Sequence, residues 1–114
     1  MINSLFNHFE SLYTVFLLVR PHFETKPQSV KAYEKTEAIF NCKLKGSPAP
    51  EVRWTKDGLP LQESNYIIEN EDHLRIMGLV TSDSGYYQCH GSNELGSIQA
   101  IAQLVVLPNS KCKK

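Results

Sequence analysis

The chain has 114 residues, a length that suits one ordinary domain with a single hydrophobic core. Its 12 basic and 12 acidic side chains cancel, so no net field steers the chain toward nucleic acid or an anionic membrane surface. Hydrophobic residues make up 41% and aromatic residues 10%, ordinary globular values that argue against a disordered, collagen-like or low-complexity chain.

The first 20 residues differ in pattern from the rest of the chain. Apolar residues recur there at steps of three and four, the spacing of an amphipathic helix: Ile2, Leu5, Phe6, Phe9, Leu12, Tyr13, Phe16 and Leu17. The longest apolar run, Val15 to Val19, is too short to span a bilayer, and residues 1–14 lack the Lys or Arg of a secretory signal. We expect residues 1–20 to be a helical or disordered extension: a leader, a linker or the end of a preceding domain.

From Pro21 onward, short β-type runs are separated by Pro, Gly, Asn and Asp, a pattern typical of a sandwich or barrel. The expected strands fall near residues 22–26, 28–34, 37–45, 51–56, 66–69, 73–77, 85–92 and 97–107. Asp57-Gly58 predicts a turn, and "NELG" from Asn93 to Gly96 predicts a hairpin between the last two strands. We therefore predict an all-β, two-sheet antiparallel sandwich over residues 21–108, followed by a basic tail over residues 109–114.

Alternation along the expected strands predicts the core. In the strand over 37–45, Ala38, Phe40, Cys42 and Leu44 share one face. The same rule turns inward Val52, Trp54, Leu74, Ile76, Tyr87, Cys89, Ala102, Leu104 and Val106. If the strands of Cys42 and Cys89 belong to opposing sheets, the two thiols can meet across the core, and Trp54 can pack over the sulfurs. Closing a loop of about 47 residues would stabilise the fold by about 4 kcal/mol on the chain-entropy description of a cross-link.

A metal site or an enzyme active site is a weaker interpretation of the cysteine and histidine residues than a structural role. No C-x-x-C or H-x-x-x-H pair occurs, which disfavours a zinc site built from Cys42, Cys89, His90 and Cys112. A reactive thiolate needs exposure and positive surroundings, whereas Cys42 lies on an apolar face. Nucleophile-elbow, phosphate-loop and dinucleotide motifs are absent from the sequence, and the acidic run over 69–72 lacks the ligand spacing of a calcium loop. We expect no enzymatic activity, no metal and no cofactor.

The string "DSGYYQC" resembles the corresponding strand of an immunoglobulin-superfamily domain. The residues that carry the resemblance are Cys42, Trp54, Leu74, Ile76, Asp83, Gly85, Tyr87 and Cys89. The resemblance implies that Asp83 and Gly85 make the turn into the strand, and that the Tyr87 hydroxyl folds back onto upstream backbone as a tyrosine corner. The short spacing between the strand of Trp54 and the strand of Leu74 and Ile76, together with the "NELG" hairpin, resembles the I-set and not an antibody variable domain.

The segments "GSPAPEVRWTKDG" and "LRIMGLVTSDSGYYQC" are most similar to the fourth immunoglobulin-like repeat of the netrin-receptor family, meaning deleted-in-colorectal-cancer, neogenin and Frazzled. In that family the repeat belongs to the ectodomain of a type I membrane receptor. The resemblance implies an extracellular, non-enzymatic recognition module of an adhesion or axon-guidance receptor, which binds protein partners or spaces adjacent immunoglobulin and fibronectin domains. On this view residues 14–23 could be the closing strand of a preceding repeat plus a linker. The alternative is an intracellular sarcomeric or cytoskeletal I-set repeat with reduced cysteines.

Several features depart from the family pattern. Residues 62–69 offer no Arg or Lys to pair with Asp83, and no N-x-S/T sequon occurs. Cys112 has no family counterpart and is expected to be a free thiol on the tail.

A candidate partner-binding face lies on the outward side of the third, sixth and seventh strands of the family pattern. Its residues are Arg53, Thr55, Tyr86, Gln88, Ile101 and Gln103. An exposed Tyr and Ile flanked by Arg and Gln resemble an interface core with a polar rim. The alternative is that these are isolated surface apolar residues without a partner.

Overall fold

The computed structural model describes residues 17–61, 67–70 and 72–109. The expected helix over the first residues and the tail thiol Cys112 therefore lie outside the described residues. The strands are β1 (Val19–Thr25), β2 (Val30–Tyr33), β3 (Ala38–Asn41), β4 (Lys43–Ser47), β5 (Glu51–Lys56), β6 (Leu59–Pro60), β7 (Ile67–Glu69), β8 (His73–Ile76), β9 (Gly85–Asn93) and β10 (Gly96–Leu107). One 3₁₀ turn, η1 (Thr81–Asp83), precedes β9. None of the described residues forms a helix long and apolar enough to cross a bilayer.

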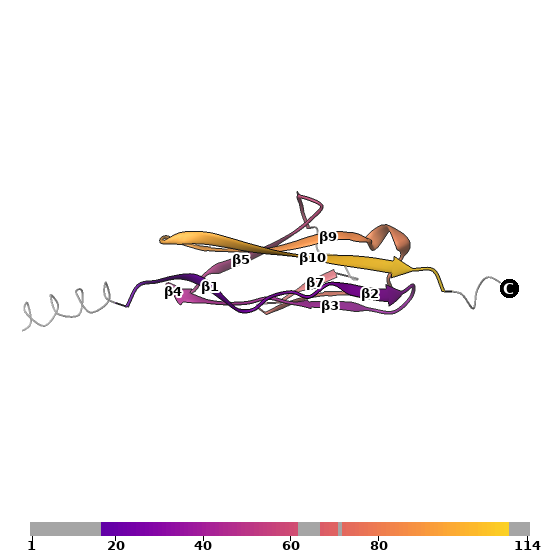
Figure 1. Ribbon diagram of the computed structural model, residues 1–114, viewed down its shortest axis with the longest axis horizontal. Coiled ribbons are helices and arrows are strands. Elements are labelled where there is room, and N and C mark those ends of the chain that lie inside the picture. Colours follow the sequence, from indigo (N-terminus) through magenta and orange to yellow (C-terminus); the bar gives the residue numbers. More distant parts are fainter. Residues whose placement is uncertain (1–16, 62–66, 71, 110–114) are drawn as a thin grey trace, which may run out of the picture.

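The strands form two facing layers (Figure 1). Five strands in the order β2–β10–β9–β5–β6 make sheet I. The second layer, called sheet II, consists of two separately hydrogen-bonded groups, the pair β1–β4 and the three strands β3–β8–β7, and the chain passes directly from β3 into β4. All strand pairs are antiparallel except β2 with β10, which is parallel. The predicted two-sheet sandwich is confirmed.

The expected strand over residues 37–45 is divided at Cys42. Its backbone N–H donates to the carbonyl oxygen of Asp72 at 2.8 Å, while β3 pairs with β8 and β4 pairs with β1. The N-terminal edge also differs from expectation. β1 begins at Val19, which lies opposite Ser47, so residues 19–23 belong to this sandwich and are not the closing strand of another repeat.

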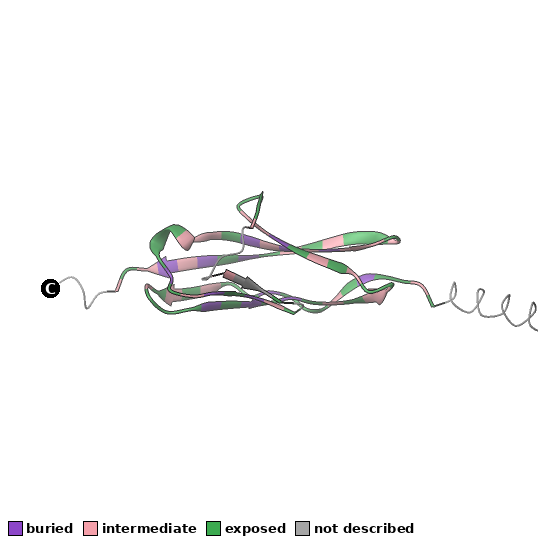
Figure 2. Cartoon of the chain, turned by 180° about the vertical axis from the view of Figure 1, so that it is seen from behind, coloured by how far each residue is buried: buried purple, intermediate pink, exposed green. Residues whose placement is uncertain are grey.

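Buried residues occur on strands of both layers (Figure 2), and their side chains form one core cluster between the sheets. Its buried residues are Ala38, Phe40, Cys42, Trp54, Leu74, Ile76, Leu79, Tyr87, Cys89, Ala102, Leu104 and Val106. The alternation pattern predicted all of these except Leu79, and it also predicted Leu44 and Val52, which are partly buried and pack against the core. Leu79 lies between β8 and η1, where no strand alternation exists to reveal it.

Cys42 and Cys89 form a disulfide across the core, with their Cα atoms 6.5 Å apart. Trp54 lies directly opposite Cys89 in the pairing of β5 with β9. The Phe40 ring is 6.3 Å from the Trp54 ring and 5.2 Å from the Tyr87 ring, measured between centroids. The predicted cross-sheet bond is therefore confirmed, and Phe40, Trp54 and Tyr87 form an aromatic cluster in the same core.

The turn after β5 explains why the motif "DSGYYQC" has a glycine at position 85. Asp57 (φ 50°) and Gly58 (φ 83°) form the turn, and the Asp57 Oδ1 atom accepts a hydrogen bond from the Tyr86 N–H at 2.9 Å. A Cβ atom on Gly85 would lie 2.6 Å from the Asp57 Oδ2 atom. Gly85 is required here because the Asp57 carboxylate occupies the space of a side chain.

Candidate functional site

The strand register places all six residues of the candidate face on the outer side of sheet I. Thr55 lies opposite Gln88, and Gln88 lies opposite Ile101. One step along, Tyr86 lies opposite Gln103. In the other direction, Arg53 of β5 lies opposite His90 of β9. We call this surface the outer face of sheet I.

The outer face of sheet I combines exposed apolar side chains with a polar centre. Tyr86 is 51% exposed and Ile101 is 55% exposed. In the same cross-strand row as Ile101, the half-buried Thr55 of β5 donates from Oγ1 to the Oε1 atom of Gln88 at 3.3 Å and lies 3.0 Å from the Nε2 atom of His90. The polar centre is therefore held in place by contacts within the sheet, with the apolar side chains beside it.

Sequence reasoning missed three contributors to this face. Alternation turned His90 outward, but only the register shows that it lies beside Arg53 and Thr55. Lys31 lies opposite Val105, and Tyr33, which is 54% exposed, lies opposite Leu107. The sequence pattern does not reveal these two, because β2 joins sheet I only through its parallel pairing with the last strand.

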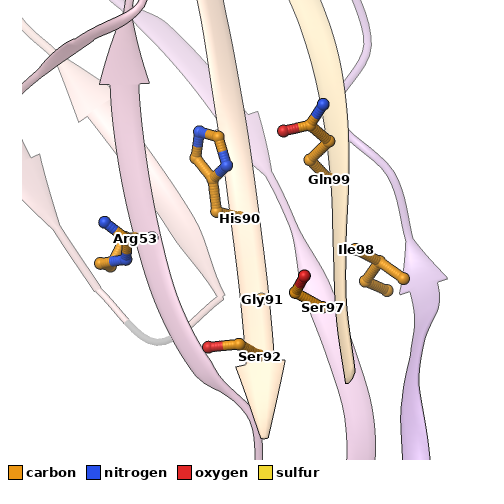
Figure 3. Close-up of a pocket in the computed structure, with 7 residues that line it drawn as sticks. All are labelled: Arg53, His90, Gly91, Ser92, Ser97, Ile98 and Gln99. Carbon is orange, nitrogen blue, oxygen red and sulfur yellow. The ribbon is translucent and has the colours of Figure 1, made fainter.

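A pocket of about 390 Å³ opens on the outer face of sheet I near the β9–β10 hairpin (Figure 3). Polar side chains from three strands line it: Arg53, His90, Ser92, Ser97 and Gln99. The remaining lining comes from Gly91 and Ile98. No sequence motif signals this pocket, because its residues come together only through the strand register.

The tyrosine corner fixes the start of β9. The Tyr87 hydroxyl donates to the backbone oxygen of Asp83 at 2.6 Å. The Asp83 Oδ2 atom accepts a hydrogen bond from the Val80 N–H at 2.9 Å. Residues 62–69 offer no Arg or Lys to pair with Asp83, and this backbone amide is the partner that its carboxylate has instead. Burial raises the pKa of Tyr87, and the negative charges of Asp83 and Asp57 raise this pKa further.

The outer face of sheet II has a different character, because it carries ion pairs. Glu24 contacts Lys43 at 3.2 Å and Lys45 at 3.4 Å, and Arg75 contacts Glu37 at 2.8 Å. The hydrogen bond from Lys43 lowers the pKa of Glu24. Such exposed pairs contribute little to stability.

The disulfide bears on the zinc interpretation. Cys42 and Cys89 are bonded to each other, so neither offers the thiolate that a zinc ion binds. In residues 17–61, 67–70 and 72–109 no group of three or more His, Cys, Asp or Glu side chains is placed to hold a metal ion.

Two facing β layers, a disulfide between them and a tyrosine corner define an immunoglobulin-type sandwich. The chain belongs to the immunoglobulin I-set domain family, which matches residues 21–106.

The chain is similar to two kinds of receptor. It is 41% identical to neogenin of Rattus norvegicus over 93 residues, which cover 81% of this chain and 7% of neogenin. It is 43% identical to netrin receptor DCC of Homo sapiens over 91 residues, which cover 79% of this chain and 6% of DCC. The chain thus spans a small part of the curated relatives that it matches.

Among solved structures, the titin M3 domain superposes with a TM-score of 0.72 and 30% sequence identity, covering 77% of this chain and 97% of that domain. The fold therefore occurs both in receptor relatives and in a titin domain.

Proposed function

We propose that residues 21–108 form a non-enzymatic protein-recognition module of a cell-surface adhesion or axon-guidance receptor. The observation that carries the proposal is the 43% identity to netrin receptor DCC over 79% of the chain. The Cys42–Cys89 disulfide supports it, because such bonds form and persist in the oxidising extracellular environment. The parent protein is then anchored in a membrane, and this module acts outside the cell.

The outer face of sheet I is the proposed contact surface. Binding energy at protein interfaces concentrates in a few aromatic and Arg anchors surrounded by polar groups. Tyr86 and Ile101 supply exposed apolar area on rigid strands, and Arg53 and Gln103 lie at either end of the same surface. A surface fixed on strands loses little conformational freedom when a partner binds.

A second candidate function is an intracellular I-set repeat of the sarcomere or cytoskeleton. The 30% identity to the titin M3 domain favours it. In that compartment Cys42 and Cys89 would stay reduced. The redox state of these two residues in the native source therefore separates the two candidates.

Netrin is the first probe for the contact surface, because DCC is named for it. The chain is displayed on cells from a membrane anchor, and binding of labelled netrin is measured by flow cytometry. We expect saturable binding, weakened about tenfold or more by the double substitution Tyr86→Asp and Ile101→Asp, because two anchors lose their apolar contact.

Ile39→Asp is the matched control, because Ile39 is an exposed apolar residue on β3 of sheet II. Equal binding by the wild type and the double variant would contradict the proposed surface. Absence of netrin binding by the wild type would contradict netrin recognition and favour a role in spacing neighbouring domains.

A further inference from the structure

Donor groups from three adjacent strands converge on the pocket of Figure 3. Arg53 of β5, His90 of β9 and Gln99 of β10 form one cross-strand row, because Arg53 lies opposite His90 and His90 lies opposite Gln99. Ser92 and Ser97 form the next row toward the hairpin, where they lie opposite each other. A guanidinium, an imidazole, an amide and two hydroxyls thus line one concavity.

Arg53 is the main source of positive charge in this pocket. Within the described part of the chain, its guanidinium forms no ion pair, in contrast to Arg75 on sheet II, which contacts Glu37. Glu51 is the nearest acidic residue on the same strand face, and it lies opposite Ser92 in the adjacent row. A guanidinium presents a planar fork of N–H donors that matches the two oxygens of a carboxylate.

The imidazole of His90 is positioned by its neighbour. Its Nε2 atom lies 3.0 Å from the Thr55 Oγ1 atom, and a hydrogen bond between them restricts rotation of the ring. Figure 3 shows the ring between Arg53 on one side and Gln99 on the other. The Gln99 amide N–H groups can therefore donate to an oxygen-bearing group in the space above the strand, and the ring lies beside that space.

The charges around the pocket indicate which class of anionic partner fits this surface. The adjacent row carries Thr55, Gln88 and Ile101, and the next carries Tyr86 and Gln103, so the cross-strand rows beside the pocket add no cation. Lys31 lies at the far end, opposite Val105. A sulfated polysaccharide needs a series of cations along its path. A polypeptide with one acidic side chain and a neighbouring apolar residue fits this surface better.

The geometry points to a carboxylate-binding pocket on the outer face of sheet I, which receives an Asp or Glu side chain of a protein partner. The carboxylate accepts hydrogen bonds from Arg53, with His90, Ser92, Ser97 and Gln99 around it. An apolar side chain next to the acid in the partner packs on Ile101. This inference names the chemistry of the partner and rests on the proposed recognition function.

A small probe tests the pocket without any protein partner. The ¹⁵N-labelled chain of 114 residues is titrated with N-acetyl-glutamate amide, and backbone amide shifts are followed by NMR. We expect saturable shifts confined to the pocket residues, with dissociation constants in the millimolar range. N-acetyl-glutamine amide, which has the same shape without the charge, is expected to give no saturable shift.

Arg53→Gln and Lys31→Gln form a matched pair of variants. Both remove one positive charge from the outer face of sheet I, and only the first lies in the pocket. We expect Arg53→Gln to weaken glutamate binding about tenfold, the loss typical of a charged hydrogen bond, and Lys31→Gln to change it less than about twofold. Both variants should keep the wild-type spectrum away from position 53 or 31.

Three results with the small probe would overturn the inference: no saturable shift at the pocket amides, equal weakening by both variants, or equal binding of the glutamine analogue. A heparin hexasaccharide is titrated in parallel. Tighter binding of heparin at the same amides would assign the pocket to sulfated polysaccharide and would overturn the choice of a protein carboxylate. Because the probe is a small molecule, loss of the pocket is distinguishable from failure of the netrin-binding test.

Discussion

Tyr87 connects β9, which lies between β10 and β5 in sheet I, with the 3₁₀ turn that precedes it. Its ring is buried against Phe40, and its hydroxyl donates to the Asp83 carbonyl oxygen at 2.6 Å. Tyr87→Phe keeps the ring and removes only this hydrogen bond. We expect a loss of about 1 kcal/mol in the free energy of unfolding, measured by urea denaturation.

Tyr86→Phe is the control for that substitution, because Tyr86 is 51% exposed and its hydroxyl forms no hydrogen bond within the described residues. Its effect should stay within about 0.5 kcal/mol. Equal losses from the two substitutions would show that the hydroxyl of Tyr87 has no special role.

The same residue makes stability depend on alkaline pH. Burial raises the pKa of Tyr87 above the unfolded value of about 10, so the folded state favours the protonated phenol. Its contribution to stability is therefore complete below about pH 10 and is lost as pH rises toward the folded pKa. Urea midpoints measured from about pH 9 to about pH 11.5 should fall more steeply for the wild type than for Tyr87→Phe. Parallel curves would contradict the raised pKa.

At the scale of the elements, Gly91 lets the two sheets approach. A Cβ atom at this position on β9 would lie 2.6 Å from the Cδ1 atom and 2.9 Å from the Cδ2 atom of Leu44, which is on β4. We expect Gly91→Ala to destabilise the fold by about 1–3 kcal/mol because Leu44 has to move. Thermal and urea unfolding would measure the loss.

Combining Gly91→Ala with Leu44→Ala should cost less than the sum of the two single substitutions, because the clash is removed. Additive effects would show that Leu44 does not restrict position 91.

Strand periodicity predicted most of these elements and most of the core. The strand over 51–56 coincides with β5, because alternation and the Asp57-Gly58 turn define both its face and its end. β6 was not predicted: it spans Leu59–Pro60 and is too short for a periodic signal. The division of the strand at Cys42 also has no local signal, since it depends on which neighbour each half pairs with.

For the whole molecule, the disulfide links the two sheets. Replacing both Cys42 and Cys89 by Ala opens the cross-link and should lower the free energy of unfolding by about 4 kcal/mol, out of a total of about 5–15 kcal/mol. Urea denaturation of the variant and of Cys112→Ala, which leaves the bond intact, measures the difference. A loss below about 1 kcal/mol would mean that the cross-link adds little to this fold.

The sequence predicted that the six residues of the candidate face lie outward, but it did not predict the pocket, whose lining includes only Arg53 of these six. Alternation gives the outward residues of each strand, and the resemblance gives the sheet in which the strands meet. The row of Arg53, His90 and Gln99 depends on a register between three strands that no local pattern specifies. The contribution of β2, through Lys31 and Tyr33, likewise depends on its parallel pairing with β10.

The central claim is that this sandwich works as an extracellular module whose two sheets are covalently joined. The most direct test is mass spectrometry of the protein from its native source, alkylated and digested without reductant. We expect a peptide pair linked through Cys42 and Cys89, with neither residue alkylated. Alkylation of both residues as free thiols would contradict the extracellular assignment and favour the intracellular repeat.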